Sequence, residues 1–188
     1  NSLAQAEFFV KEEQRMRFDY EQFGAMSRKS EADTRNNYGL KRFEDAFLSS
    51  MNWMREYRFS HEPVAFAFDI SCTFLKKYDY AVRVLKHWLS QHPEDYATQN
   101  NLIYALGLSD QIDAAEHEMS KTNIRQQLED ENKTDNGICL LATQGLLEYR
   151  KGHVEEGRQW YQLSIDTAKR LRDKDLAGKA RLNMIREE

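Results

Sequence analysis

The feature that most constrains the fold of this chain is a register in which its apolar residues recur. When the sequence is shifted by 34 residues, large apolar residues fall on large apolar residues and one alanine falls on another. The aligned pairs are Phe68 and Leu102, Tyr78 and Ile112, Ala81 and Ala115, and Leu85 and Met119. A further shift of 42 residues brings Val154, Gly157 and Tyr161 into the same register, with the 8 extra residues assigned to the polar stretch 125–136. Recurrence at a spacing of about 20–50 residues is typical of repeat architectures.

Apolar residues inside each unit are spaced three and four apart, which is the period of an amphipathic α-helix. The chain has only 2 Pro and 8 Gly, and no window alternates β-branched with polar residues, so we expect helices and essentially no sheet. Two longer helices are predicted before the repeats, from Ala4 to about Ser30 and from Leu40 to Tyr57, with a polar break from Ser30 to Asn37. From Val64 onward the predicted helices are shorter and the breaks more regular.

Three small residues, Ala81, Ala115 and Gly157, stand at equivalent places near the start of the second helix of each unit. A small residue at such a place allows two helix backbones to approach closely. Large residues three positions before it and four positions after it form one stripe on the helix surface. We expect this stripe to face the partner helix of the hairpin.

In these features the chain resembles the tetratricopeptide repeat family over about residues 62–188. The clearest unit spans residues 141–164 and has small residues in both helices and a glycine in the turn. These residues are Gly145, Gly152, Gly157 and Ser164. Asp69 and Trp88 depart from the family pattern, because they occupy positions where the family has small residues, and the second unit has no turn glycine.

The resemblance implies an all-α fold of antiparallel helical hairpins stacked as a right-handed superhelix, an α-solenoid, with the long N-terminal helices packed on it. The implied units lie at about 62–95, 96–137 and 138–175, followed by a capping helix at 176–188. Residues 1–60 are predicted to form an N-terminal helical pair or a degenerate repeat. A generic helical bundle is the alternative.

Stacked hairpins of this family form a concave groove lined mainly by their first helices, and the family commonly binds an extended peptide or a partner's helix there. The resemblance assigns a set of candidate partner-binding residues to this groove: Asn100, Asn101, Tyr104, Thr143, Leu146, Tyr149, Lys179, Asn183 and Arg186. The predicted lining also includes Phe66, Ile70 and Thr73. The amides of Asn101 and Asn183 can hydrogen-bond a bound backbone, and Tyr104 and Tyr149 offer stiff contact area.

Sequence motifs of catalysis are missing from the chain. It carries no glycine-rich phosphate-binding loop, no nucleophile elbow and no zinc-ligand spacing of His and Cys, so we expect no enzyme activity, no cofactor and no metal site. The net charge of −4 argues against a nucleic-acid partner, and the sequence predicts no membrane helix.

Cys72 and Cys139 stand among apolar neighbours and are predicted to be reduced cysteines in helix packing, with a disulfide as the alternative.

These observations favour a noncatalytic, cytoplasmic protein–protein interaction scaffold that binds a peptide segment or partner helix in the groove, as part of a larger protein or assembly. The alternative is a regulatory sensor domain whose repeats bind a small peptide or effector and control an attached catalytic or DNA-binding domain. The N-terminus has no signal-peptide pattern and lacks an initiator Met, which suggests an excised fragment. The Phe- and Met-rich first 60 residues also suit a homodimer formed through the N-terminal helices.

Overall fold

The computed structural model describes residues 29–130 and 134–188, and all regular secondary structure in this part is helical. In chain order the helices are α3 (Lys29–Gly39), α4 (Phe43–Glu56), α5 (Glu62–Asp69), η2 (Ile70–Leu75), α6 (Tyr78–Leu89), α7 (Tyr96–Leu108), α8 (Ile112–Ser120), α9 (Ile124–Glu129), α10 (Thr134–Arg150), α11 (Val154–Arg170) and α12 (Lys174–Glu187). The stretch η2 is π-helical and continues α5 directly. The expectation of an all-helical fold is therefore confirmed over these residues.

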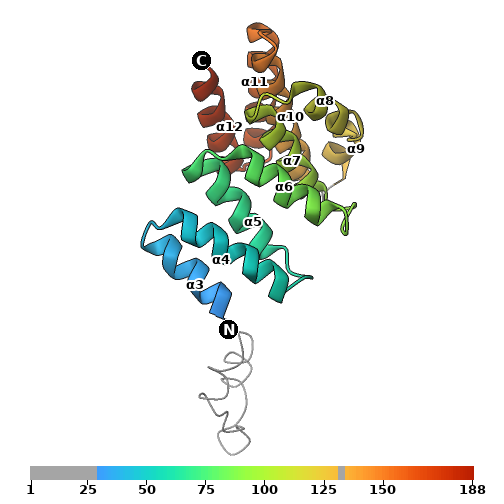
Figure 1. Ribbon diagram of the computed structural model, residues 1–188. Coiled ribbons are helices and arrows are strands. Elements are labelled where there is room, and N and C mark those ends of the chain that lie inside the picture. Colours follow the sequence, from blue (N-terminus) through green and yellow to red (C-terminus); the bar gives the residue numbers. More distant parts are fainter. Residues whose placement is uncertain (1–28, 131–133) are drawn as a thin grey trace, which may run out of the picture.

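The helices form hairpins that pack against their neighbours along the chain. The hairpins are α3 with α4, α5–η2 with α6, α7 with α8, and α10 with α11, while α12 packs on both α10 and α11. Contacts between α4 and α5, α6 and α7, and α7 and α10 join one hairpin to the next. Figure 1 shows α3 to α6 following one another from the N-terminal end, with α10, α11 and α12 side by side at the opposite end.

A residue in the left-handed conformation stands in the turn of each of these four described hairpins. The turn residues have positive φ: Lys41 at 59°, Lys76 at 55°, Asp110 at 57° and Gly152 at 86°. After three of them the next residue donates its N–H to a carbonyl five residues earlier, which is the Schellman arrangement of a helix end: Arg42 to Asn37, Gln111 to Leu106, and His153 to Glu148. Only one of the four turn residues is glycine, so the left-handed conformation is imposed by the hairpin geometry and not by a glycine pattern.

A small buried residue follows each turn residue by five positions. Ala46, Ala81 and Ala115 are 0% exposed, and Gly157 is also buried. Helices α10 and α11 approach each other closely, since a Cβ added to Gly145 would lie 3.0 Å from the carbonyl oxygen of Gly157. The predicted role of small residues in helix approach is thus seen at this crossing. In the α3–α4 hairpin, the small residue stands at the same distance after the turn residue as in the other hairpins.

The core runs along the hairpins as a continuous set of buried side chains. Its largest fully buried members include Ile70, Leu85, Ile103, Leu106, Leu140 and Leu147. Among the described residues, every buried side-chain nitrogen or oxygen has a hydrogen-bond partner. None of the described helices combines the length and the apolar character that crossing a membrane requires.

The largest disagreement with the sequence-based expectation is α3, which occupies the stretch predicted to be a polar break. Side-chain bonds stabilise this polar helix: the Thr34 hydroxyl donates to the Ser30 carbonyl at 2.7 Å, and the Arg35 Nε donates to Glu31 at 2.9 Å. The Arg35 guanidinium also lies over the rings of Trp53 and Phe66 at 5.4 and 5.3 Å. Such contacts give a helix its stability without an apolar stripe. The predicted helix from Ala4 falls almost entirely outside the described residues.

Other boundaries also differ from the prediction. The helix expected from Leu40 to Tyr57 begins at Phe43, because Lys41 adopts the left-handed turn conformation. The polar insertion contains the short helix α9, whose first turn is capped by the Asn123 side chain accepting from the Gln126 N–H at 3.1 Å. The capping helix starts at Lys174, earlier than expected.

Candidate functional site

A groove lies between the first helices of the hairpins and α12, and we call it the first-helix groove. It encloses a cavity of about 390 Å³ bounded by α5–η2, α7, α10 and α12. The lining residues used below are Asp69 and Thr73 of α5–η2, Asn101 and Tyr104 of α7, Cys139 of α10, and Lys179, Asn183 and Arg186 of α12. The groove is therefore built from segments far apart in the sequence.

Two consecutive asparagines of α7 have different roles in this groove. Asn100 is only 7% exposed, and its Oδ1 accepts a hydrogen bond from the Thr143 hydroxyl of α10 at 2.8 Å. Thr143 is 3% exposed, and its hydroxyl oxygen also lies 3.0 Å from the Cys139 carbonyl oxygen. This pair joins α7 to α10 at the floor of the groove. Asn101 is half-buried in the groove wall, so its amide is the one accessible to a ligand.

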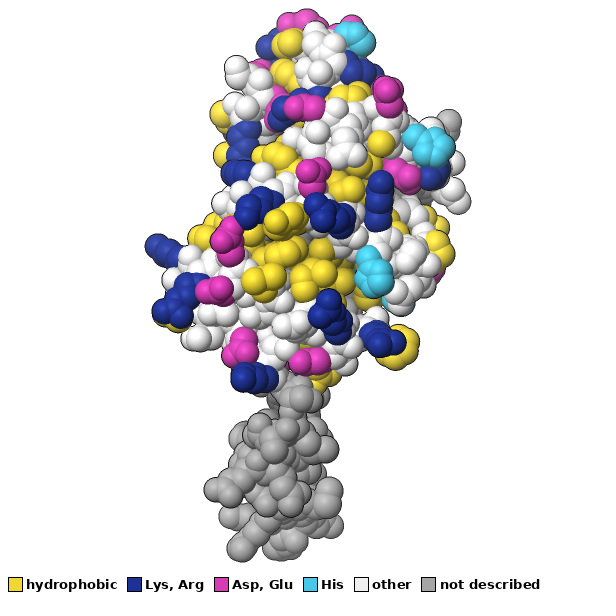
Figure 2. All heavy atoms as spheres, in the orientation of Figure 1, with side chains coloured by type: hydrophobic (Ala, Val, Ile, Leu, Met, Phe, Trp, Pro, Cys, Tyr) yellow, Lys and Arg dark blue, Asp and Glu magenta, His cyan; other side chains and the backbone are white. Residues whose placement is uncertain are grey.

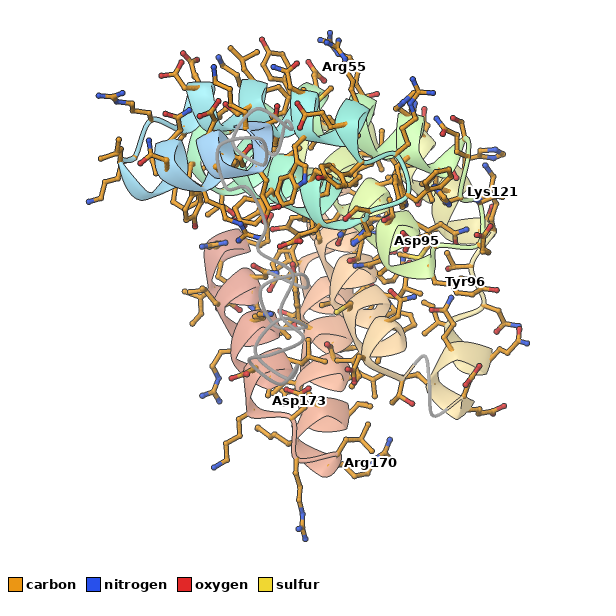
Figure 3. The ribbon with its side chains drawn as sticks, turned by 90° about the horizontal axis from the view of Figure 1, so that it is seen from below. Arg55, Asp95, Tyr96, Lys121, Arg170 and Asp173 are labelled. Atoms are coloured by element: carbon orange, nitrogen blue, oxygen red, sulfur yellow. The ribbon has the colours of Figure 1, made fainter. Side chains whose placement is uncertain are left out.

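The α12 wall supplies the cations. Lys179 and Arg186 are exposed, and the Arg186 guanidinium donates to the Asn183 amide oxygen at 3.4 Å. The start of α12 is fixed by Asp173, whose carboxylate accepts from the Leu176 N–H at 2.8 Å. Figure 3 shows Asp173 at this start, with Arg170 extending away from the end of α11.

The opposite wall carries a carboxylate. Asp69 is exposed at the end of α5, and its Oδ1 accepts from the Thr73 hydroxyl at 2.9 Å. The groove thus has an anionic wall on α5–η2 and a cationic wall on α12, with the amide of Asn101 and the ring of Tyr104 on α7. This polarity suits a ligand that carries both hydrogen-bonding groups and charge, such as a polypeptide segment.

A smaller hollow of about 220 Å³ continues the groove toward the C-terminal ends of α7 and α12. Tyr104, Asn183 and Arg186 line both spaces. Beyond them the Arg150 Nε pairs with Glu187 at 3.1 Å, which closes this end. Burial raises the pKa of Tyr104, so its hydroxyl stays protonated at neutral pH and can donate a hydrogen bond.

The structure brings most of the predicted site residues together and places the others elsewhere. Asn100, Asn101, Tyr104, Thr143, Lys179, Asn183 and Arg186 line the first-helix groove. Leu146 is 1% exposed and belongs to the core, and Tyr149 contacts Tyr161 with ring centroids 5.9 Å apart. The predicted Phe66 packs edge-on against Tyr38, and Ile70 is fully buried. Regularly spaced positions of a first helix do not all face the groove. Side chains point in different directions around a helix, so some lie in the groove and others lie in the core.

Sequence reasoning missed two parts of the molecular surface. The first is the α10 wall, where Ile138, Cys139 and Ala142 form the apolar side of the groove. The second is a cavity between α4 and α6. Its signal in the sequence is the spacing of Met51 and Arg55, which are four residues apart and so lie on one helix face.

The described residues offer little reactive chemistry. No group of three or more His, Cys, Asp and Glu residues in ranges 29–130 and 134–188 is placed to hold a metal ion. Both cysteines are free thiols. Burial raises the pKa of Cys72 to about 12 and also raises the pKa of Cys139, so neither thiol is activated as a nucleophile.

Comparison of the chain with protein-family models gives no match. Searches among curated proteins and among solved structures likewise give no match.

Proposed function

We propose that this chain is a noncatalytic protein–protein interaction scaffold that binds a peptide segment or a partner's helix in the first-helix groove. The observation that carries the proposal is the groove itself, in which α5–η2, α7, α10 and α12 present amides, charges and an aromatic ring around a cavity of about 390 Å³. Grooves of this kind bind polypeptide by hydrogen bonds to its backbone and by pockets for its side chains.

We further propose that the hairpins form a tetratricopeptide-like superhelix that includes α3 and α4. Support comes from the turn residues Lys41, Lys76, Asp110 and Gly152, which share one backbone conformation at spacings of 35, 34 and 42 residues. Further support comes from the small buried residue that follows each turn residue by five positions, which aligns the four hairpins with one another. On this proposal α3–α4 is the first unit of the series, and the groove is the concave surface expected of stacked hairpins.

The ligand proposed for the groove follows from its charges. An extended segment lying between α5–η2 and α12 can place a cationic group near Asp69 and a carboxylate near Lys179 or Arg186. Its backbone amides are then within reach of Asn101 and Asn183. The ring of Tyr104 supplies contact area of the kind that dominates binding energy in many interfaces.

The test is a pull-down of partners with quantitative mass spectrometry, using the full chain and a groove variant, Asn101→Ala/Lys179→Ala/Asn183→Ala. Its matched control is Gln159→Ala/Gln162→Ala, which alters exposed polar residues of α11 outside the groove. Circular dichroism verifies that all three proteins are folded. We expect the chain and the control to retain a protein that the groove variant loses. Equal retention by all three proteins contradicts the proposal.

A second readout uses Cys139, which lines the groove. A peptide from the retained protein is mixed with the full chain, and the rate of maleimide attachment to Cys139 is followed by intact mass. A peptide bound in the groove covers this thiol and slows its labelling, while a peptide bound elsewhere leaves the rate unchanged.

A further inference from the structure

A second surface lies between the C-terminal halves of α4 and α6 and shares no lining residue with the first-helix groove. It encloses a cavity of about 510 Å³, and we call it the α4–α6 surface. Its residues used below are Met51, Met54, Arg55, Arg58, His87 and Trp88. Figure 2 shows hydrophobic side chains gathered between α4 and α6 on this face, with Lys and Arg and also Asp and Glu side chains around them.

The floor of the α4–α6 surface combines a rigid ring with adaptable side chains. Trp88 is held in place because its ring stacks on His92 at 3.9 Å and its Nε1 donates to the Asp95 carboxylate at 2.8 Å. Met51 and Met54 are half-buried beside it. Methionine side chains adapt their shape to a partner, and a fixed aromatic ring provides an anchor for contact.

The rim of this surface is cationic. Arg55 and Arg58 line the cavity, whereas Arg83 and Lys86 are residues of α6 outside its lining, and all four are exposed. None of these four side chains forms an ion pair with a carboxylate of the described residues. The cavity lining contains no Asp or Glu, and Figure 3 shows Arg55 extending outward from α4.

Helix dipoles account for only part of this charge. Arg55 and Lys86 lie in the last turns of α4 and α6, where cations stabilise the helix ends. Arg58 follows α4, and Arg83 lies before the last turn of α6. In a chain with a net charge of −4, a cationic rim around an apolar floor is complementary to an acidic, amphipathic ligand.

We propose that the α4–α6 surface binds an acidic amphipathic helix of a partner protein. A large apolar side chain of that helix enters the cavity against Met51, Met54 and Trp88. Carboxylates on its flank reach Arg55 and Arg58 at the rim. This is the helix-in-groove mode of recognition, and it is independent of the first-helix groove.

The test uses three synthetic, fluorescein-labelled peptides and the full chain, with binding followed by fluorescence anisotropy. The first peptide has Leu and Phe spaced three and four apart with Glu elsewhere. The second replaces each Glu by Lys, and the third replaces Leu and Phe by Ser. We expect binding of the first peptide alone, with an affinity that weakens as salt is added, because exposed charge pairs are screened.

Charge exchange locates the binding surface. Arg55→Glu/Arg58→Glu is expected to weaken binding of the Glu peptide by at least about tenfold, because attraction at the rim becomes repulsion, and to allow binding of the Lys peptide. The matched control is Arg170→Glu/Lys174→Glu, which reverses two exposed cations of α11 and α12. This control is expected to keep the specificity of the unaltered chain.

Four results overturn the proposal. The first is the absence of binding to the Glu peptide, and the second is equal loss of binding in both charge-reversed variants. The third is equal binding of the Ser peptide, which shows that the apolar floor is not used. The fourth is a concentration-dependent dimer that Met54→Glu dissociates in sedimentation, because the surface is then covered by a second copy of the chain.

Discussion

At the residue scale, Asp95 joins three elements of the fold through one carboxylate. Its Oδ1 caps α7 by accepting from the Thr98 N–H at 3.0 Å, and its Oδ2 accepts from the Trp88 Nε1 at 2.8 Å. The Nε2 of His61, before α5, lies 3.6 Å from the Asp95 Oδ2 and 2.9 Å from the Thr98 hydroxyl. Figure 3 shows Asp95 next to Tyr96 at the start of α7. A cap is predictable from a sequence, but its bond to a tryptophan of the preceding helix is not, because that bond depends on how α6 and α7 cross.

We predict that Asp95→Ala lowers the free energy of unfolding by about 2–4 kcal/mol, because the cap is lost and the buried indole N–H of Trp88 is left without its acceptor. The matched control is Asp173→Ala, which removes only the cap of α12 and should cost about 1 kcal/mol. Urea unfolding followed by circular dichroism measures both. Equal costs for the two variants contradict a structural role of the Trp88–Asp95 bond.

The same carboxylate gives the fold a dependence on pH. Burial raises the pKa of Asp95, but hydrogen bonds from the Thr98 N–H, Trp88 and the Thr98 hydroxyl outweigh it, and the net pKa is lowered. A lowered pKa contributes stability that is complete above the ordinary pKa of about 4 and is lost as the pH falls through the folded-state value. We predict that Asp95→Asn has a shallower loss of stability below about pH 4 than the unaltered chain, measured by urea unfolding across this range. Parallel curves for the two proteins argue against this origin of the acid sensitivity.

At the scale of single elements, the α10–α11 crossing depends on two glycines. A Cβ on Gly145 would lie 2.7 Å from the ring of the buried Tyr161 and 3.0 Å from the Gly157 carbonyl oxygen. We predict that Gly145→Ala destabilises the chain by about 1–3 kcal/mol, because overpacking outweighs the better helix propensity of alanine. The control is Gly178→Ala in α12, where a Cβ meets nothing within 4 Å and the propensity gain of about 0.5–1 kcal/mol remains. Thermal unfolding should therefore shift in opposite directions, and a stabilising Gly145→Ala is the contrary result.

The helices also show which parts of the structure could be predicted from the sequence and which could not. The hairpins after Val64 were predictable because Ala81, Ala115 and Gly157 recur in phase with large apolar residues. Helix α3 was not, because its local bonds are supplemented by contacts of Arg35 with Glu62 and Phe66, which are distant in the sequence. The sequence predicted which helices line the groove, but not which of their side chains face it. Asn100 and Asn101 are adjacent, yet one bonds Thr143 and the other faces the groove.

At the scale of the whole molecule, the hairpins interact mainly with their neighbours along the chain. Helix α3 packs chiefly on α4, whereas α10 contacts α7, α8, α9, α11 and α12. In arrays with nearest-neighbour contacts, stability is a sum of local terms, so a local change acts locally. The α3–α4 hairpin and the α11–α12 pair should therefore open independently in the native state.

This independence can be tested with two matched substitutions of helical alanines, Ala46→Gly in α4 and Ala180→Gly in α12, which are 0% and 4% exposed. Each should cost about 1 kcal/mol locally, which corresponds to about fivefold faster amide exchange in the affected hairpin. We predict that Ala46→Gly accelerates hydrogen–deuterium exchange in α3 and α4 and leaves α11 and α12 unchanged, and that Ala180→Gly does the reverse. Exchange that accelerates equally in all helices for both variants shows one cooperative unit instead, because a single global opening then exposes every amide.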